Sequence, residues 1–272
     1  MSLGDTLLKE KKAGKTPFVA YVTAGDPDLA TTAKVVRALA DAGTAAIELG
    51  VPFSDPVADG PTNQRAAERA LKSGTTLRKV LGLARDLKRD GVKTPLVLFT
   101  YFNPVFRMGL AEFAREAKAA GIVAVLCVDL PPEEADPYKK ELDAQGVETI
   151  FLASPMTSPE RLPLVERYSS STVYYVSRTG VTGERTQLSD TLDDEVKRAK
   201  SVIRSRAVIV GFGISSPEQA KAVAAHADGV VVGSAIVKLI EDSRGGEDAA
   251  ERVRKFAQNI VKSLNTSGDS AC

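Results

Sequence analysis

The stretch ADAGTAAIELG, residues 40–50, carries the pattern that predicts the fold. The end of an amphipathic helix meets a glycine, which can adopt the left-handed conformation that closes a helix, and an apolar strand follows at once. The helix shows the matching period, since its apolar residues Leu29, Ala33, Val36 and Ala40 fall at i, i+4, i+7 and i+11. The same helix–glycine–strand unit recurs with KRDG (88–91) before PLVLF, AKAAG (117–121) before VAVLCV, and LDAQG (142–146) before ETIFLA.

Eight apolar segments are candidate strands. They are continuously apolar instead of alternating, which is typical of a parallel sheet covered on both faces. Right-handed crossovers would place every helix on the outside, so we predict an α/β fold, a single closed (β/α)8 TIM barrel over residues 1–264 with a flexible tail at 265–272. An open doubly wound sheet is the alternative. The expected strands are 18–23, 45–50, 96–101, 122–128, 148–153, 172–177, 207–212 and 229–233.

Composition excludes several classes of function. The 272 residues include 36 Lys and Arg against 35 Asp and Glu, so no strong field attracts nucleic acid or an anionic membrane. A single histidine, His226, and two cysteines, Cys127 and Cys272, offer neither a disulfide framework nor metal-ligand spacing, so no metal is expected. No run reaches the length of a membrane helix, and Met1 to Lys12 lacks the apolar core of a secretory signal. We therefore expect a cytoplasmic protein.

Glu48 is the most informative single residue. A carboxyl group among the apolar neighbours of AAIELGV loses hydration, which raises its pKa and suits it to general acid–base catalysis. The structural alternative is a buried ion pair with a basic residue of a neighbouring strand. Because the strand interiors contain no Lys or Arg, the sequence favours a catalytic role.

Asp59 lies in the stiff, proline-rich loop that follows the Glu48 strand. In a barrel the active site lies at the carboxyl ends of the strands, so this loop reaches it. Asp59 also precedes Gly60-Pro61-Thr62, a plausible helix start, where an aspartate could serve only as an N-cap. Position alone leaves the catalytic and the capping roles open.

Glycine-rich turns after strands seven and eight predict a phosphate site. GFGISSPEQ (211–219) joins a strand to a helix start, and Gly233-Ser234 follows the next strand, so backbone N–H groups and helix ends converge there. Turn glycines without a ligand are the alternative. The polar segment 177–190 is predicted to be an active-site lid, with a merely mobile loop as the alternative. No lysine lies at a strand end, which argues against a Schiff-base aldolase.

Taken together, the motifs resemble a known family. The segments YVTAGDP (21–27), ELGVPFSDPVADGPTNQ (48–64), YFNPVFRMG (101–109), VDLPPEE (128–134), SRTGVTG (177–183) and GFGISSPEQ are similar, in order, to those of the tryptophan synthase α chain. The resemblance covers residues 15–240. It implies a (β/α)8 barrel lyase of tryptophan biosynthesis that cleaves indole-3-glycerol phosphate to indole and glyceraldehyde 3-phosphate by a retro-aldol step, without cofactor or metal.

The resemblance also implies roles for individual residues. Glu48 and Asp59 match the two catalytic carboxylates, and Asn63 stands where the family usually has an apolar residue. The expected substrate-binding residues are Tyr21, Tyr101, Tyr174, Thr182 and Phe212, and the expected phosphate-binding residues are Gly183, Gly213, Gly233 and Ser234.

The family resemblance further implies a protein partner, a tryptophan synthase β chain in an α2β2 heterotetramer. Asp55 and Pro56, at the tip of the loop after Glu48, are the expected contact residues. Two other functions remain open at this point. One is a phosphosugar isomerase barrel. The other is a chain that has lost efficient catalysis and serves mainly to activate its partner, a possibility that Asn63 keeps open.

Overall fold

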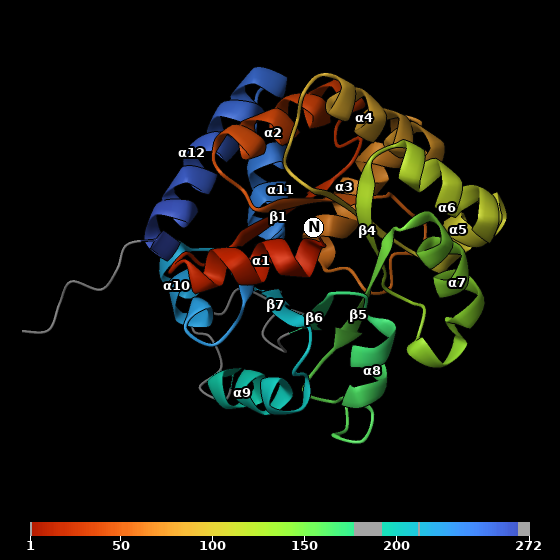
Figure 1. Ribbon diagram of the computed structural model, residues 1–272. Coiled ribbons are helices and arrows are strands. Elements are labelled where there is room, and N and C mark those ends of the chain that lie inside the picture. Colours follow the sequence, from red (N-terminus) through yellow and green to blue (C-terminus); the bar gives the residue numbers. More distant parts are fainter. Residues whose placement is uncertain (1, 177–191, 212, 266–272) are drawn as a thin grey trace, which may run out of the picture.

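A computed structural model describes residues 2–176, 192–211 and 213–265 of the chain. Its eight parallel strands form a closed barrel in sequence order, and the last strand pairs with the first through Phe18–Val230, Val19–Val231 and Ala20–Val232 (Figure 1). The predicted TIM barrel is confirmed and the open sheet is wrong. Each predicted strand agrees with the structure to within one residue at either end: β1 (Phe18–Thr23), β2 (Ala46–Gly50), β3 (Leu96–Thr100), β4 (Ile122–Cys127), β5 (Glu148–Ala153), β6 (Thr172–Val176), β7 (Ala207–Gly211) and β8 (Gly229–Val232).

Helices surround the barrel (Figure 1). Four of the helix-ending glycines have the predicted positive φ, at 86° for Gly43, 91° for Gly91, 75° for Gly121 and 63° for Gly146. The long last helix, α12 (Gly246–Asn265), packs against α2 (Leu29–Asp41), so the last described helix lies beside the first βα unit. The helices are α1 (Leu3–Lys12), α2 (Leu29–Asp41), α3 (Pro61–Lys72), α4 (Leu77–Arg89), α5 (Phe102–Met108), α6 (Leu110–Ala119), the 3₁₀ turn η1 (Pro132–Glu134), α7 (Asp136–Gln145), α8 (Leu162–Tyr168), α9 (Leu192–Val202), α10 (Pro217–Ala224), α11 (Ser234–Glu241) and α12 (Gly246–Asn265).

Two apolar layers explain why the strands are continuously apolar. Alternate residues of each strand face opposite sides of the sheet. On β2, Ile47 and Leu49 belong to the layer between strands and helices, whereas Ala46 belongs to the cluster inside the barrel. Glu48 shares the inward side with Ala46, because the two are separated by two positions. The fold therefore places a carboxyl group in the barrel interior.

Helix α1 covers the amino-terminal end of the barrel. Leu3 and Leu7 join the inner apolar cluster, and the Leu3 N–H donates to Glu148 Oε1 at 3.0 Å. The Gly4 N–H donates to Ser171 Oγ at 2.9 Å, so the helix is joined to the first residues of β5 and to the residue before β6. In Figure 1 the amino terminus lies near the centre of the barrel. The opposite end, which holds the βα loops, is left for a site.

The predicted domain limits lie close to the last described residue. Helix α12 continues to Asn265, one residue into the expected tail, and residues 266–272 lie outside the described part of the chain. Among residues 2–176, 192–211 and 213–265, no helix has the length and apolar character needed to cross a membrane.

Candidate active site

Glu48 is a buried carboxyl group without a partner. Its side chain projects from β2 into the barrel, the residue is 1% exposed, and neither carboxyl oxygen has a hydrogen-bond partner in the described structure. Burial alone raises its pKa from 4.5 to about 8. The group therefore holds its proton at neutral pH yet can release it within the physiological range, as a residue that acts alternately as acid and base requires.

The buried ion pair considered as the alternative for Glu48 is found instead at Asp26. Asp26, after β1, is 1% exposed and binds Arg69 of α3 through two hydrogen bonds of 2.7 and 2.9 Å. Arg69 also donates to Glu241 of α11 at 2.8 Å. Burial raises the pKa of Asp26, but the Arg69 guanidinium opposes that rise. This network joins the segment after β1 to α3 and α11. Both carboxylates in it are bound to Arg69, whereas the carboxyl group of Glu48 has no partner in the described structure.

Asp59 is held at the end of the neighbouring loop. Its Oδ2 accepts a hydrogen bond from the Tyr101 hydroxyl at 2.7 Å, and its Oδ1 lies 3.5 Å from Asn63 Nδ2. Burial raises its pKa, while the hydrogen bonds from Tyr101 and then Asn63 lower it. The capping role is excluded, because the N-cap of α3 is Gly60 and no side chain caps that helix.

Aromatic side chains line the interior next to both carboxyl groups. Tyr21 is the register partner of Glu48, and its ring meets Phe99 edge to face with centroids 5.0 Å apart. Burial raises the pKa of Tyr21 well above 10, and the negative charge of Asp59 adds to that rise more than the charge of Glu48 does. The pKa of buried Tyr174 is raised in the same way by burial and then by Glu48. These two expected substrate-binding residues therefore share one electrostatic environment with the two carboxyl groups.

Two glycines make room for these tyrosines. A Cβ on Gly50, at the end of β2, would lie 2.3 Å from the Tyr21 hydroxyl, and one on Gly211, at the end of β7, would lie 2.1 Å from the Tyr174 hydroxyl. Both distances are far shorter than any real contact. A side chain at either position would displace one of these two tyrosines, a constraint that strand periodicity could not reveal.

The expected phosphate-binding residues that the structure describes lie where the chain enters two helices, α10 and α11. The two helices differ in whether side chains cap their first backbone N–H groups. The first turn of α10 is closed by its own side chains, since Ser216 accepts from the Gln219 N–H and Gln219 Oε1 accepts from the Ser215 N–H at 2.8 Å. Helix α11 begins at Ser234 with no side-chain cap after Gly233. The free helix end available to an anion is thus that of α11, with Gly213 (φ 78°) on the neighbouring turn.

Several predicted residues cannot be placed. Thr182, Gly183 and Phe212 lie outside the described residues, and so does the lid expected at 177–190. The strands that precede them are described, β6 as far as Val176 and β7 as far as Gly211. Asp55 is exposed and Pro56 is half-buried at the tip of the loop after β2.

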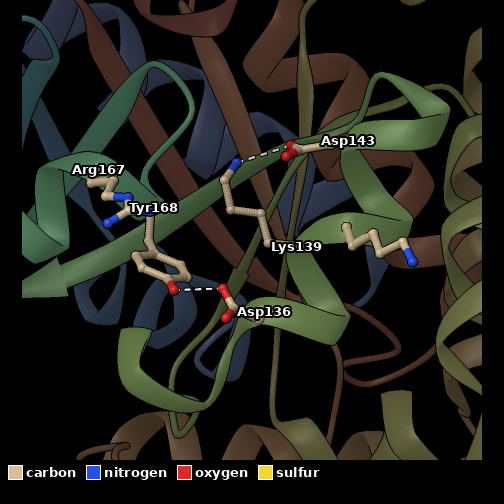
Figure 2. A pocket seen from close by; sticks show the side chains of 6 residues that line it. Asp136, Lys139, Asp143, Arg167 and Tyr168 are labelled. Atoms are coloured by element: carbon tan, nitrogen blue, oxygen red, sulfur yellow. Dashed lines mark hydrogen bonds and ion pairs between the residues drawn. The ribbon is translucent and has the colours of Figure 1, made fainter.

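A surface pocket of about 380 Å³ lies elsewhere, on the outer side of the barrel beside α7 and α8 (Figure 2). Its polar side chains bind one another: Lys139 Nζ lies 2.9 Å from Asp143 Oδ1, and the Tyr168 hydroxyl donates to Asp136 Oδ1 at 2.5 Å. No predicted site residue reaches it. The paired carboxylates of this pocket contrast with Glu48, whose oxygens have no hydrogen-bond partner in the described structure.

Comparison with known proteins agrees with this geometry. The family model described as "Tryptophan synthase alpha chain" matches residues 7–265. The chain belongs to the tryptophan synthase alpha chain family. It is 48% identical to the tryptophan synthase alpha chain of Geotalea uraniireducens over 266 residues, covering 98% of both chains.

Solved structures extend the likeness to the fold. The alpha subunit of tryptophan synthase from Legionella pneumophila str. Paris superposes with a TM-score of 0.90 at 34% identity, over 98% of this chain and 100% of that one. A chain from the tryptophan synthase a2b2 complex of Pyrococcus furiosus gives a TM-score of 0.84 at 41% identity, over 91% of this chain and 99% of that one. The family named from sequence motifs is therefore confirmed.

Sequence reasoning missed two contacts of Asp59, those with Tyr101 and Asn63. Tyr101 is predicted to bind substrate. Its hydroxyl group donates a hydrogen bond to Asp59 and accepts one from the Ala58 N–H at 3.1 Å. Asn63, noted only as a departure from the family pattern, lies against Asp59. Its position four residues after Asp59, one turn along the start of a helix, was the available signal.

Proposed function

We propose that the protein is the α subunit of a tryptophan synthase and cleaves indole-3-glycerol phosphate to indole and glyceraldehyde 3-phosphate, with Glu48 and Asp59 as its catalytic residues. The observation that carries the residue assignment is the buried, unpartnered carboxyl group of Glu48, whose pKa of about 8 lies close to neutral pH. Neither a cofactor nor a metal is required by the reaction that follows.

The cleavage divides between the two carboxyl groups. Glu48, protonated at neutral pH, donates its proton to indole C3, and the Glu48 carboxylate then takes the proton of the C3′ hydroxyl. The C3–C3′ bond breaks as the hydroxyl carbon becomes the aldehyde, and its electron pair restores the aromatic indole. Glu48 ends the cycle protonated. Asp59 stays ionised and stabilises the positive charge that C3 protonation places on the ring N–H.

Indole release by the purified chain is the direct test. We expect indole and glyceraldehyde 3-phosphate in equal amounts from indole-3-glycerol phosphate. A chain that releases no indole but interconverts a separately supplied triose phosphate would instead support the phosphosugar isomerase alternative. Indole formation only in the presence of a β chain would support the alternative of a chain that has lost efficient catalysis by itself.

We propose that the substrate phosphate binds at Gly213, Gly233 and Ser234. We expect Gly213→Val to raise KM roughly tenfold or more, because its side chain blocks a main-chain donor to a charged group, a bond typically worth about 1.5–3 kcal/mol. Gly91→Val is the matched control, since Gly91 shares the positive φ of Gly213 (91° and 78°), and a Cβ at Gly91 would meet no atom within 4 Å. The control should lose stability without a change in KM. Equal KM values in both variants would contradict this site.

We also propose a tryptophan synthase β chain as the partner, in an α2β2 assembly, docking on the loop that contains Asp55 and Pro56. Large apolar side chains are exposed in the segments that follow β2, β3 and β5: Val57 is 85% exposed, Phe106 65% and Met156 72%. Such side chains at a barrel mouth are typical of a protein interface. The chain's compartment is then the cytoplasm, a proposal with which the free, buried thiol of Cys127 agrees.

Pro56→Gly should weaken activation by the β chain. Loosening the loop costs binding free energy without touching the barrel, and we expect a loss of about twofold to fivefold in apparent affinity for the β chain. Titration of indole-forming activity with the β chain measures it. Pro95→Gly, at the opposite end of the barrel before β3, is the control and should leave activation unchanged. The interface proposal fails if the purified chains neither co-migrate nor alter each other's rates.

A further inference from the structure

We infer that Tyr101 and Asn63 are positioning residues that hold Asp59 as a two-donor clamp, one donor for each carboxylate oxygen. The inference rests on the proposed function in that it takes Asp59 to be the catalytic carboxylate. It assigns Tyr101 to Asp59 instead of to the substrate, and it gives Asn63 a task in this chain.

The direction of the Tyr101 hydroxyl is determined by its two partners. The Ala58 N–H donates to the hydroxyl oxygen at 3.1 Å, and a phenol has only one proton to donate. That proton is therefore directed to Asp59 Oδ2, 2.7 Å away. Tyr101 also stacks on Phe53, with ring centroids 5.1 Å apart. Tyr101 follows β3, and its three partners, Phe53, Ala58 and Asp59, all lie in the loop after β2, so this one side chain connects the two segments.

Asn63 supplies the second donor at the start of α3. Its Nδ2 lies 3.5 Å from Asp59 Oδ1, a long hydrogen bond, and the opposite amide orientation would place oxygen against oxygen. With Nδ2 directed to Asp59, Asn63 Oδ1 is buried and has no partner in the described structure. A buried acceptor left unpaired is destabilising and calls for an explanation, which the contact of the same amide with Asp59 provides.

The remaining groups around Asp59 do not replace these donors. Tyr21 of β1 and Tyr174 of β6 face it as neutral phenols whose own pKa values are raised by its charge. Glu48 of β2 donates no hydrogen bond to Asp59, because neither of its carboxyl oxygens has a partner in the described structure. The hydrogen bonds that favour the charged form of Asp59 in the described structure come from Tyr101 and Asn63. A carboxylate has about four lone-pair sites, so two remain for the ring N–H of a substrate.

The test is to titrate the Asp59 carboxyl carbon by NMR in Tyr101→Phe and Asn63→Leu, with Asp59→Asn used to assign the signal. Both variants should raise the pKa of Asp59, and Tyr101→Phe should raise it more because its bond is shorter. The kcat of Tyr101→Phe should fall roughly tenfold to hundredfold, as for a lost hydrogen bond to a charged group, and the acidic limb of its pH–rate profile should move to higher pH.

Matched controls separate positioning from packing. Tyr138→Phe removes a buried hydroxyl that has no partner in the described structure, and Gln64→Leu removes an amide that binds the Asp59 main-chain oxygen at 2.8 Å. Both should leave the Asp59 titration unchanged. The inference is overturned if Asp59 titrates identically in all four variants, or if kcat falls while its pKa does not move. Since the titration needs no substrate, it distinguishes failure of the clamp from failure of the proposed reaction, which the indole assay reports.

Discussion

Glu48→Gln is expected to lower kcat for indole formation by about 10²-fold to 10⁴-fold, the range typical of a lost general acid–base group. Glutamine keeps the size of the side chain but can neither give a proton to C3 nor accept one from the C3′ hydroxyl. Steady-state indole release measures the loss. Glu148→Gln is the control: Glu148 also lies on a strand, but it binds the Leu3 N–H at the other end of the barrel. Near-normal turnover of Glu48→Gln would remove Glu48 from the mechanism.

The same substitution should stabilise the protein at high pH. Between the ordinary pKa of 4.5 and the folded value of about 8, the unfolded chain has released the Glu48 proton while the folded chain retains it. The free energy of unfolding of the wild type therefore falls across this window, by about 1.4 kcal/mol per pH unit from this group. Below pH 4.5 the two states bind the proton equally and the contribution vanishes.

We therefore expect Glu48→Gln and the wild type to differ little through this linkage at pH 4.5, and the variant to gain on the order of 3–5 kcal/mol relative to the wild type by pH 8. Urea unfolding at both pH values measures this change. A difference between the two proteins that does not vary with pH would mean that Glu48 titrates normally in the folded state.

Asp59→Asn should lower kcat by about 10²-fold to 10³-fold, as loss of one preorganised electrostatic group commonly does. An amide can still accept the Tyr101 hydroxyl but carries no charge to balance the protonated indole ring. Folding should be unaffected by loss of a cap, because Gly60 and not Asp59 is the N-cap of α3.

Kinetics and thermal unfolding of Asp59→Asn check both statements. Asp55→Asn is the matched control, since Asp55 lies in the same loop but is exposed at its tip. The isolated Asp55→Asn chain should retain its turnover. Full activity of Asp59→Asn would leave Glu48 as the only carboxyl group that the reaction needs.

Helix ends, strands and the burial of Glu48 could be predicted from the sequence, because they depend on residues close together in the chain. Glycine positions such as Gly43 and Gly146 closed helices as predicted, and the continuous apolar runs predicted each strand to within one residue. Glu48 was found because a lone carboxyl group in an apolar strand is buried whichever barrel forms around it. These features follow from backbone geometry and burial within a few residues of each position.

The tertiary structure alone decided which carboxyl groups have partners. Arg69 neutralises Asp26 from 43 positions away, and Tyr101 reaches Asp59 from 42 positions away. The physical reason is that the pKa of a buried group depends on every donor and charge within a few ångströms, and barrel closure brings those groups together from strands and loops far apart in the chain.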